Sequence, residues 1–234
     1  MTTQCQVLIS PIRKENSEQS EMISQMLYGE TCEILESSDG FSKIRMDFDK
    51  TEGWMNSSNL KEISGISEKF LITEPFGVYD LEQGRSLLSI GCEVDFPTEK
   101  SEKSDNVREN ILNLSKEFLN VPYLWGGRSF FGVDAEGFVQ LVFKIHEIAL
   151  PRPSEKMAVL GEVIDFLGES EAGDLAFFEN EEGKINHVGI MLNSYELIHA
   201  FGKVRIDSLD SSGIYNNELK KHTHKLRFVK KVIV

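Results

Sequence analysis

The chain has 234 residues, enough for one large core or two to three small ones, and its apolar fraction of 40% is typical of folded domains. Its 25 basic and 38 acidic residues give a formal net charge of −13. Because a nucleic-acid site needs clustered Lys and Arg to displace counterions, this charge argues against a nucleic-acid partner.

The N-terminus has no basic start followed by a long apolar stretch, and no window approaches the ~18 apolar residues of a membrane span. We therefore expect a cytoplasmic protein with no membrane partner. The three cysteines, Cys5, Cys32 and Cys92, are widely spaced and contain no CxxC pair. They are predicted to be small buried residues, not a disulfide framework or a zinc site, and we expect no metal and no cofactor.

Short apolar runs separated by turn residues fill the N-terminal region, a spacing typical of a small barrel of short strands. The runs are Gln6–Ile9, Glu33–Leu35, Lys43–Met46 and Gly53–Met55. A second β-like stretch with glycine breakers follows, and then a charged segment without bulky apolar residues. We therefore predict a barrel over residues 1–62, a second, smaller β segment over 66–97 and a linker over 98–106.

Beyond the linker the apolar period becomes helical. The spacing predicts one helix from Val107 to Phe118, a second one after Asp134 as its N-cap, and a third one through Met157, Leu160, Ile164 and Leu167. Strand-like runs follow at Asp174–Phe178, His187–Leu192, Glu196–Phe201 and Leu226–Val234. Helices followed by antiparallel strands predict an α+β domain over residues 107–234.

Five motifs occur in a fixed order in this domain. They are Pro122–Arg128 (PYLWGGR), Gly132–Val139 (GVDAEGFV), Gly173–Phe178 (GDLAFF), Asn186–Ile190 (NHVGI) and Leu197–Ala200 (LIHA). The set resembles the NlpC family of cell-wall cysteine peptidases, whose domain has a papain-like α+β fold. The N-terminal segment, with Glu21–Gln25 and Gly29-Glu30 before Gly53-Trp54, is similar to the bacterial SH3-like barrels of γ-D-glutamyl-L-diamino-acid endopeptidases. One or two such barrels are therefore expected ahead of the papain-like domain.

The resemblance implies catalytic roles for three positions. A cysteine at a helix N-terminus attacks the substrate as a thiolate, a histidine exchanges the proton, and a second polar residue orients that histidine. By resemblance, His187 is the base and His199 the orienting residue. The position of the nucleophile is occupied by Ala135, whose methyl group cannot ionise or attack.

Two further departures lie near the same site. Glu136 stands where the family has a small serine, and Pro153 stands where the family commonly has an aspartate that receives the free amine of the substrate. The resemblance implies a ligand site formed by Tyr123, Asp134, Glu136, Pro153 and Ser154. We also expect an ionised Glu136 at the helix N-terminus to pair with His187 and to raise the pKa of that imidazole.

These observations favour a catalytically inactive relative of peptidoglycan stem-peptide endopeptidases that binds or senses a muropeptide or another small peptide. Three alternatives remain: an active hydrolase of the same family if Ala135 is an engineered change, an enzyme that uses Glu136 and His187 for acid–base chemistry, and a protein-interaction scaffold. The two histidines also fit a purely structural role as buried residues that hydrogen-bond each other. The sequence carries no signal for an oligomeric state.

Overall fold

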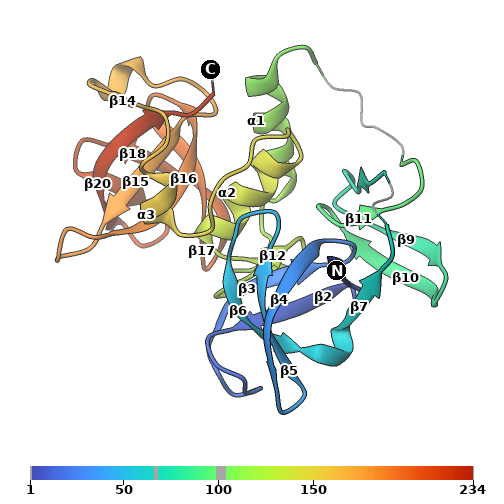
Figure 1. The fold of residues 1–234 in the computed structure, drawn as a ribbon. Coiled ribbons are helices and arrows are strands. Elements are labelled where there is room, and N and C mark those ends of the chain that lie inside the picture. Colours follow the sequence, from blue (N-terminus) through green and yellow to red (C-terminus); the bar gives the residue numbers. More distant parts are fainter. Residues whose placement is uncertain (1, 66–67, 99–103, 234) are drawn as a thin grey trace. The chain divides into compact units, whose positions relative to one another are not determined.

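A computed structural model describes residues 2–65, 68–98 and 104–233 (Figure 1). The chain divides into two compact units. The first comprises Met1–Glu102 and Leu124–Gly132, and the second comprises Lys103–Tyr123 and Val133–Val234. Part of the expected linker, residues 99–103, lies outside the described residues.

The first unit is built from short antiparallel strands, as the spacing of its apolar runs predicts. A seven-stranded sheet has the order β3-β2-β6-β5-β4-β1-β7. Its strands are β1 (Thr2–Cys5), β2 (Ile9–Arg13), β3 (Met22–Leu27), β4 (Thr31–Ser38), β5 (Phe41–Met46), β6 (Glu52–Asn56) and β7 (Leu60–Ile63), with the 3₁₀ turn η1 (Ser57–Asn59) before β7. Alternate residues of β5 and β6 are buried, the period-2 pattern of strands with one face on a core.

Two of the three cysteines are part of the apolar core of this sheet. Cys5 and Cys32 are buried in it beside Ile12, Ile44 and Met55. All three cysteines of the chain are free and buried, which confirms the prediction of small buried residues. Burial raises the pKa of Cys5 and Cys32 to about 12, so neither thiol is a nucleophile at neutral pH.

Two short antiparallel pairs follow in the first unit. They are β8 (Phe70–Leu71) with β11 (Glu93–Val94), and β9 (Phe76–Leu81) with β10 (Gly84–Ser89). The unit is completed by Leu124–Gly132, a segment from much later in the chain that contains the strand β12 (Arg128–Ser129). β12 packs against β3 and pairs with β13 (Gly132–Val133), where the chain returns to the second unit.

The helices of the second unit are α1 (Val107–Glu117), α2 (Ala135–Lys144) and α3 (Ser154–Met157). The first two confirm the predicted helices, and α2 packs against α1. The third prediction is wrong. After the single turn of α3 the chain is extended as β14 (Glu162–Ile164) and then forms the 3₁₀ turn η2 (Leu167–Glu169). Gly161 has φ +68°, and a Cβ there would lie 2.2 Å from the carbonyl oxygen of Lys231, so the chain turns sharply where a helix was expected.

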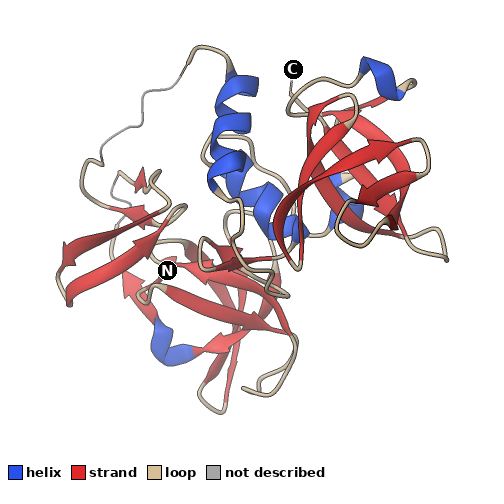
Figure 2. Ribbon diagram, turned by 180° about the vertical axis from the view of Figure 1, so that it is seen from behind, coloured by secondary structure: helices blue, strands red, loops and turns tan. Residues whose placement is uncertain are grey.

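The strands of the second unit form an antiparallel sheet of order β14-β20-β15-β16-β17-β18-β19. Figure 2 draws these strands in red. They are β15 (Leu175–Glu179), β16 (Ile185–Asn193), β17 (Glu196–Phe201), β18 (Lys203–Asp210), β19 (Gly213–Asn216) and β20 (Lys221–Lys231). Because β19 also pairs with β20, six of the strands close into a barrel and β14 stays at an edge. The α2 helix packs against β16 and β17, so its N-terminus belongs to the same unit as the two predicted histidines.

In the described part of the chain, we find no helix with both the length and the apolarity that crossing a membrane requires.

Candidate active site

The position of the expected nucleophile is the first residue of α2. Ala135 is buried, and the preceding Asp134 caps the helix by accepting a hydrogen bond from the Gly137 backbone N–H at 2.7 Å. The other carboxylate oxygen of Asp134 accepts a hydrogen bond from Arg152 Nη2 at 2.6 Å in a buried ion pair. The N-terminus of α2 is therefore held in place by its cap, and its dipole would stabilise a thiolate, but the side chain at this position is the methyl group of Ala135.

His187 and His199 lie on the neighbouring strands β16 and β17. Both are buried, and His187 Nε2 lies 2.8 Å from His199 Nδ1, which confirms that the two imidazoles hydrogen-bond each other. His199 Nε2 lies 3.2 Å from Asp207 Oδ2 on β18. The buried Asp207 carboxylate also accepts hydrogen bonds from Arg205 Nε at 2.8 Å and from Asn216 Nδ2 at 3.1 Å.

This chain of contacts fixes the tautomers of both histidines. Burial alone would raise the pKa of Asp207, but hydrogen bonds from His199 and Arg205 lower it, so the group is ionised and only accepts. His199 therefore donates from Nε2 and accepts at Nδ1, and His187 donates from Nε2. The lone pair of His187 is left on Nδ1, the form that a general base requires.

A third imidazole joins this pair. His224, on β20, stacks on His187 with ring centroids 4.1 Å apart and an angle of 22° between the planes. Burial and the neighbouring imidazoles lower the pKa of His187 well below its usual value, and burial and His199 lower the pKa of His224 to about 4. The imidazoles are therefore uncharged at neutral pH.

Glu136 does not pair with His187, so that expectation is wrong. Among the residues that the structure describes, neither His187 nor His199 forms a hydrogen bond or an ion pair with this carboxylate. The half-buried Glu136 instead accepts a hydrogen bond from the Ser154 hydroxyl. Burial and the charge of Asp134 raise the pKa of Glu136, against the opposing effect of Arg152. The expected rise in the imidazole pKa is also wrong, because burial lowers the pKa of both histidines.

The remaining predicted ligand residues gather around α2 and α3. Tyr123 is half-buried, and burial together with the charges of Asp134 and Glu136 raises its pKa to about 12. Pro153 is exposed at the N-cap of α3 and makes no side-chain capping bond, whereas Ser154 is buried. Tyr123, Asp134, Glu136 and Ser154 thus form one polar cluster at the start of α2.

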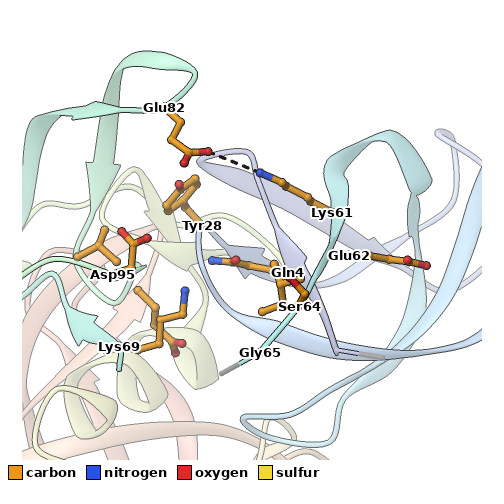
Figure 3. Close-up of a pocket in the computed structure, with 12 residues that line it drawn as sticks. Gln4, Tyr28, Lys61, Glu62, Ser64, Gly65, Lys69, Glu82 and Asp95 are labelled. Carbon is orange, nitrogen blue, oxygen red and sulfur yellow. Dashed lines mark ion pairs between the residues drawn. The ribbon is translucent and has the colours of Figure 1, made fainter. Parts of the chain in front are cut away.

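No group of three His, Cys, Asp or Glu side chains within residues 2–65, 68–98 and 104–233 is arranged to hold a metal ion. A pocket of about 320 Å³ lies elsewhere, in the first unit (Figure 3). Its lining mixes Lys61 and Lys69 with acidic groups, and Lys61 pairs with the exposed Glu82 at 3.7 Å. None of its lining residues belongs to the predicted site.

Sequence reasoning did not identify Asp207, Arg205 or His224 as residues of the site. Gly202 is the residue from which the placement of Asp207 and Arg205 could have been predicted. It is the one residue between β17 and β18, and its φ of +70° permits the tight turn that sets His199 opposite Arg205. The proximity of His224 and His187 had no local signal, because it depends on the pairing of both β20 and β16 with β15.

Two parts of the chain match known protein families. Residues 120–225 match the NlpC/P60 family, and residues 12–60 match the bacterial dipeptidyl-peptidase Sh3 domain. The chain is 40% identical over 94 residues to a γ-D-glutamyl-L-lysine dipeptidyl-peptidase of Bacillus subtilis, a match covering 39% of this chain and 31% of the relative. It thus spans about a third of the length of that relative.

Two further comparisons cover more of their counterparts. A probable endopeptidase NlpC of Escherichia coli is 32% identical over 120 residues, which are 49% of this chain and 77% of the relative. The crystal structure of an NlpC/P60 family protein from Bacillus cereus superposes with a TM-score of 0.84 over 100% of both chains at 17% identity, a likeness of fold. The chain belongs to the NlpC/P60 family of peptidoglycan hydrolases.

Proposed function

We propose that this chain is a catalytically inactive member of its family that binds a wall-derived peptide or a related small peptide. One observation carries the proposal. The base His187 and the groups that orient it, His199 and Asp207, are assembled in full, while the residue that begins α2 is Ala135. A thiol mechanism needs a nucleophile within reach of its base, and an alanine methyl cannot supply one.

Ligand binding is favoured over a scaffold role by the polar cluster at the start of α2. Glu136 and Tyr123 are only half-buried, and the capping Asp134 and its partner Arg152 hold the first turn of α2 in place. Pro153 stands where the family commonly has the aspartate that receives the substrate amine. We therefore expect the site to recognise a peptide by hydrogen bonds from the polar cluster, Tyr123 included.

A second candidate function has one observation in its favour. The pKa of Glu136 is raised by burial and by Asp134, and a carboxyl group with a raised pKa is suited to general acid–base work. Hydrolysis by this route would need a water held between Glu136 and the bond to be cut. The absence of a Glu136–His187 contact among the described residues makes this the weaker candidate.

Binding is tested by isothermal titration calorimetry with L-Ala-γ-D-Glu-diaminopimelate. The chain should bind the tripeptide with a Kd below about 1 mM, and Tyr123→Phe should weaken binding by about 2- to 10-fold through the loss of one hydrogen bond. Tyr195→Phe removes a hydroxyl from an exposed turn of the same unit and should leave the Kd unchanged. If no heat of binding is measured with this peptide or with other muropeptides, the scaffold alternative is the better account.

A further inference from the structure

Within the first unit, the segment Leu124–Gly132 lies against the barrel, with its strand β12 packed on β3. Arg128 has no exposed surface, and its guanidinium is paired with the equally buried carboxylate of Glu30. The backbone N–H of Arg128 donates to Gln25 Oε1 at 2.7 Å, and its Nε donates to the Gln25 carbonyl at 3.2 Å. The ring of Phe48 lies 5.5 Å from the guanidinium carbon.

Contacts on either side of Arg128 extend this docking. The indole N–H of Trp125 donates to Glu21 Oε1 at 3.0 Å, and the backbone N–H of Phe130 donates to Ser89 Oγ at 2.9 Å. At Gly126 the backbone lies so close to β3 that an added Cβ would be 2.6 Å from the Met22 carbonyl oxygen. The segment is therefore held along its length by side chains and backbone of one unit.

The buried ion pair between Arg128 and Glu30 contributes more to the specificity of this docking than to its stability. Burying a guanidinium and a carboxylate removes both from water, and their attraction offsets that cost only where the geometry is good and further hydrogen bonds are made. Here Glu30 also accepts a hydrogen bond from the Leu27 N–H at 2.8 Å, which fixes the carboxylate independently of Arg128. The barrel thus presents a preformed anionic site to one arginine of its own chain.

The two ends of the segment lead directly to the candidate active site. Tyr123 is the residue before Leu124, and only Val133 and Asp134 separate Gly132 from Ala135. A displacement of the docked segment must therefore be absorbed within one to three residues, since consecutive Cα atoms are about 3.8 Å apart. We propose that the barrel uses this face internally, with Leu124–Gly132 as its ligand and Arg128 as the anchor, and thereby positions Tyr123 and the first turn of α2. Arg128 is then a positioning residue.

Hydrogen exchange measured by mass spectrometry on the full chain tests this role without any ligand. In Arg128→Met, amides of the first turn of α2, among them Gly137 and Phe138, should exchange about tenfold faster, because local opening becomes easier. Amides of β15, in the centre of the second unit, should keep their rates. The matched control is Arg45→Met, which removes an exposed pair with Glu52 at 2.8 Å from the same barrel and should leave α2 unchanged.

Two outcomes would overturn the proposal. Faster exchange confined to β3 would make the arginine a structural residue of the barrel alone. Equally faster exchange in α2 and β15 would show a general loss of stability. If Arg128→Met does not yield folded protein, Glu30→Gln provides the same comparison, since it removes the charge of the partner and keeps the arginine side chain.

Discussion

Replacing Asp207 by alanine is expected to destabilise the second unit by about 3–5 kcal/mol, the usual cost of leaving a buried charge without its partner. This buried carboxylate accepts hydrogen bonds from His199, from Arg205 and from Asn216. Its removal leaves three buried or nearly buried donors unsatisfied at once, which exceeds the loss of a single hydrogen bond.

The control for Asp207→Ala is His222→Ala. It breaks the exposed pair between His222 and Asp210, whose atoms are 2.9 Å apart, and should cost less than about 1 kcal/mol. Urea unfolding followed by far-UV circular dichroism measures both variants. Both tryptophans, Trp54 and Trp125, belong to the first unit, so tryptophan fluorescence should show that unit unchanged. Equal stability of the two variants would contradict the role given to Asp207.

Acid is expected to weaken the second unit before Asp207 is protonated. The pKa values of His187, His199 and His224 are all lowered, chiefly by burial, so the unfolded chain binds more protons than the folded one below pH 6.5. Their contribution is complete above the unfolded pKa and is lost as the pH falls toward the folded pKa. For His224, whose pKa moves from 6.5 to about 4, the loss at pH 5 is about 2 kcal/mol.

Other groups around these imidazoles do not reverse this direction. The stabilisation that comes with the lowered pKa of Asp207 is lost only in stronger acid, and Arg205 stays charged throughout. The raised pKa of Glu136 acts in the opposite sense and offsets part of the loss. Urea midpoints between pH 7 and pH 5 should therefore fall steeply for the wild-type chain.

The variant His224→Phe isolates one of these titrations. A phenyl ring suits the site, because Phe201 and Phe178 already contact the imidazole at 5.0 and 6.0 Å between centroids. The pH dependence should become shallower by about 2 kcal/mol between pH 7 and 5, whereas Tyr195→Phe, which changes an exposed side chain of the same unit, should keep the wild-type slope. A wild-type slope in His224→Phe would show that this imidazole does not titrate as described.

Local patterns were sufficient where the signal lies in neighbouring residues. The N-cap Asp134, the apolar helix α2 that follows it and the strand β17 are encoded within a few residues, and all are found as predicted. The third helix failed because the spacing of Met157, Leu160 and Ile164 fits a helix, while Gly161 and the pairing of β14 with β20 impose an extended chain.

Contacts between residues far apart in the sequence could not be predicted from such local patterns. Asp207 lies in a strand with several charged residues, so its burial was not visible, and His224 meets His187 only because β20 pairs with β15, which in turn pairs with β16. The docking of Arg128 onto Glu30 joins residues 98 positions apart. The nearness of Glu136 to Ala135 in sequence suggested contact with His187, but its side chain meets Ser154.

The central claim is that the chain binds a peptide at this site without cleaving it. Mass spectrometry of L-Ala-γ-D-Glu-diaminopimelate incubated with the chain tests it most directly, with a cysteine-containing relative as the positive control. Removal of a nucleophile lowers kcat on the order of 10⁶-fold in a serine protease, so no product should form here while calorimetry detects binding. Release of diaminopimelate at a rate insensitive to thiol reagents and abolished by Glu136→Gln would contradict the claim and establish acid–base hydrolysis instead.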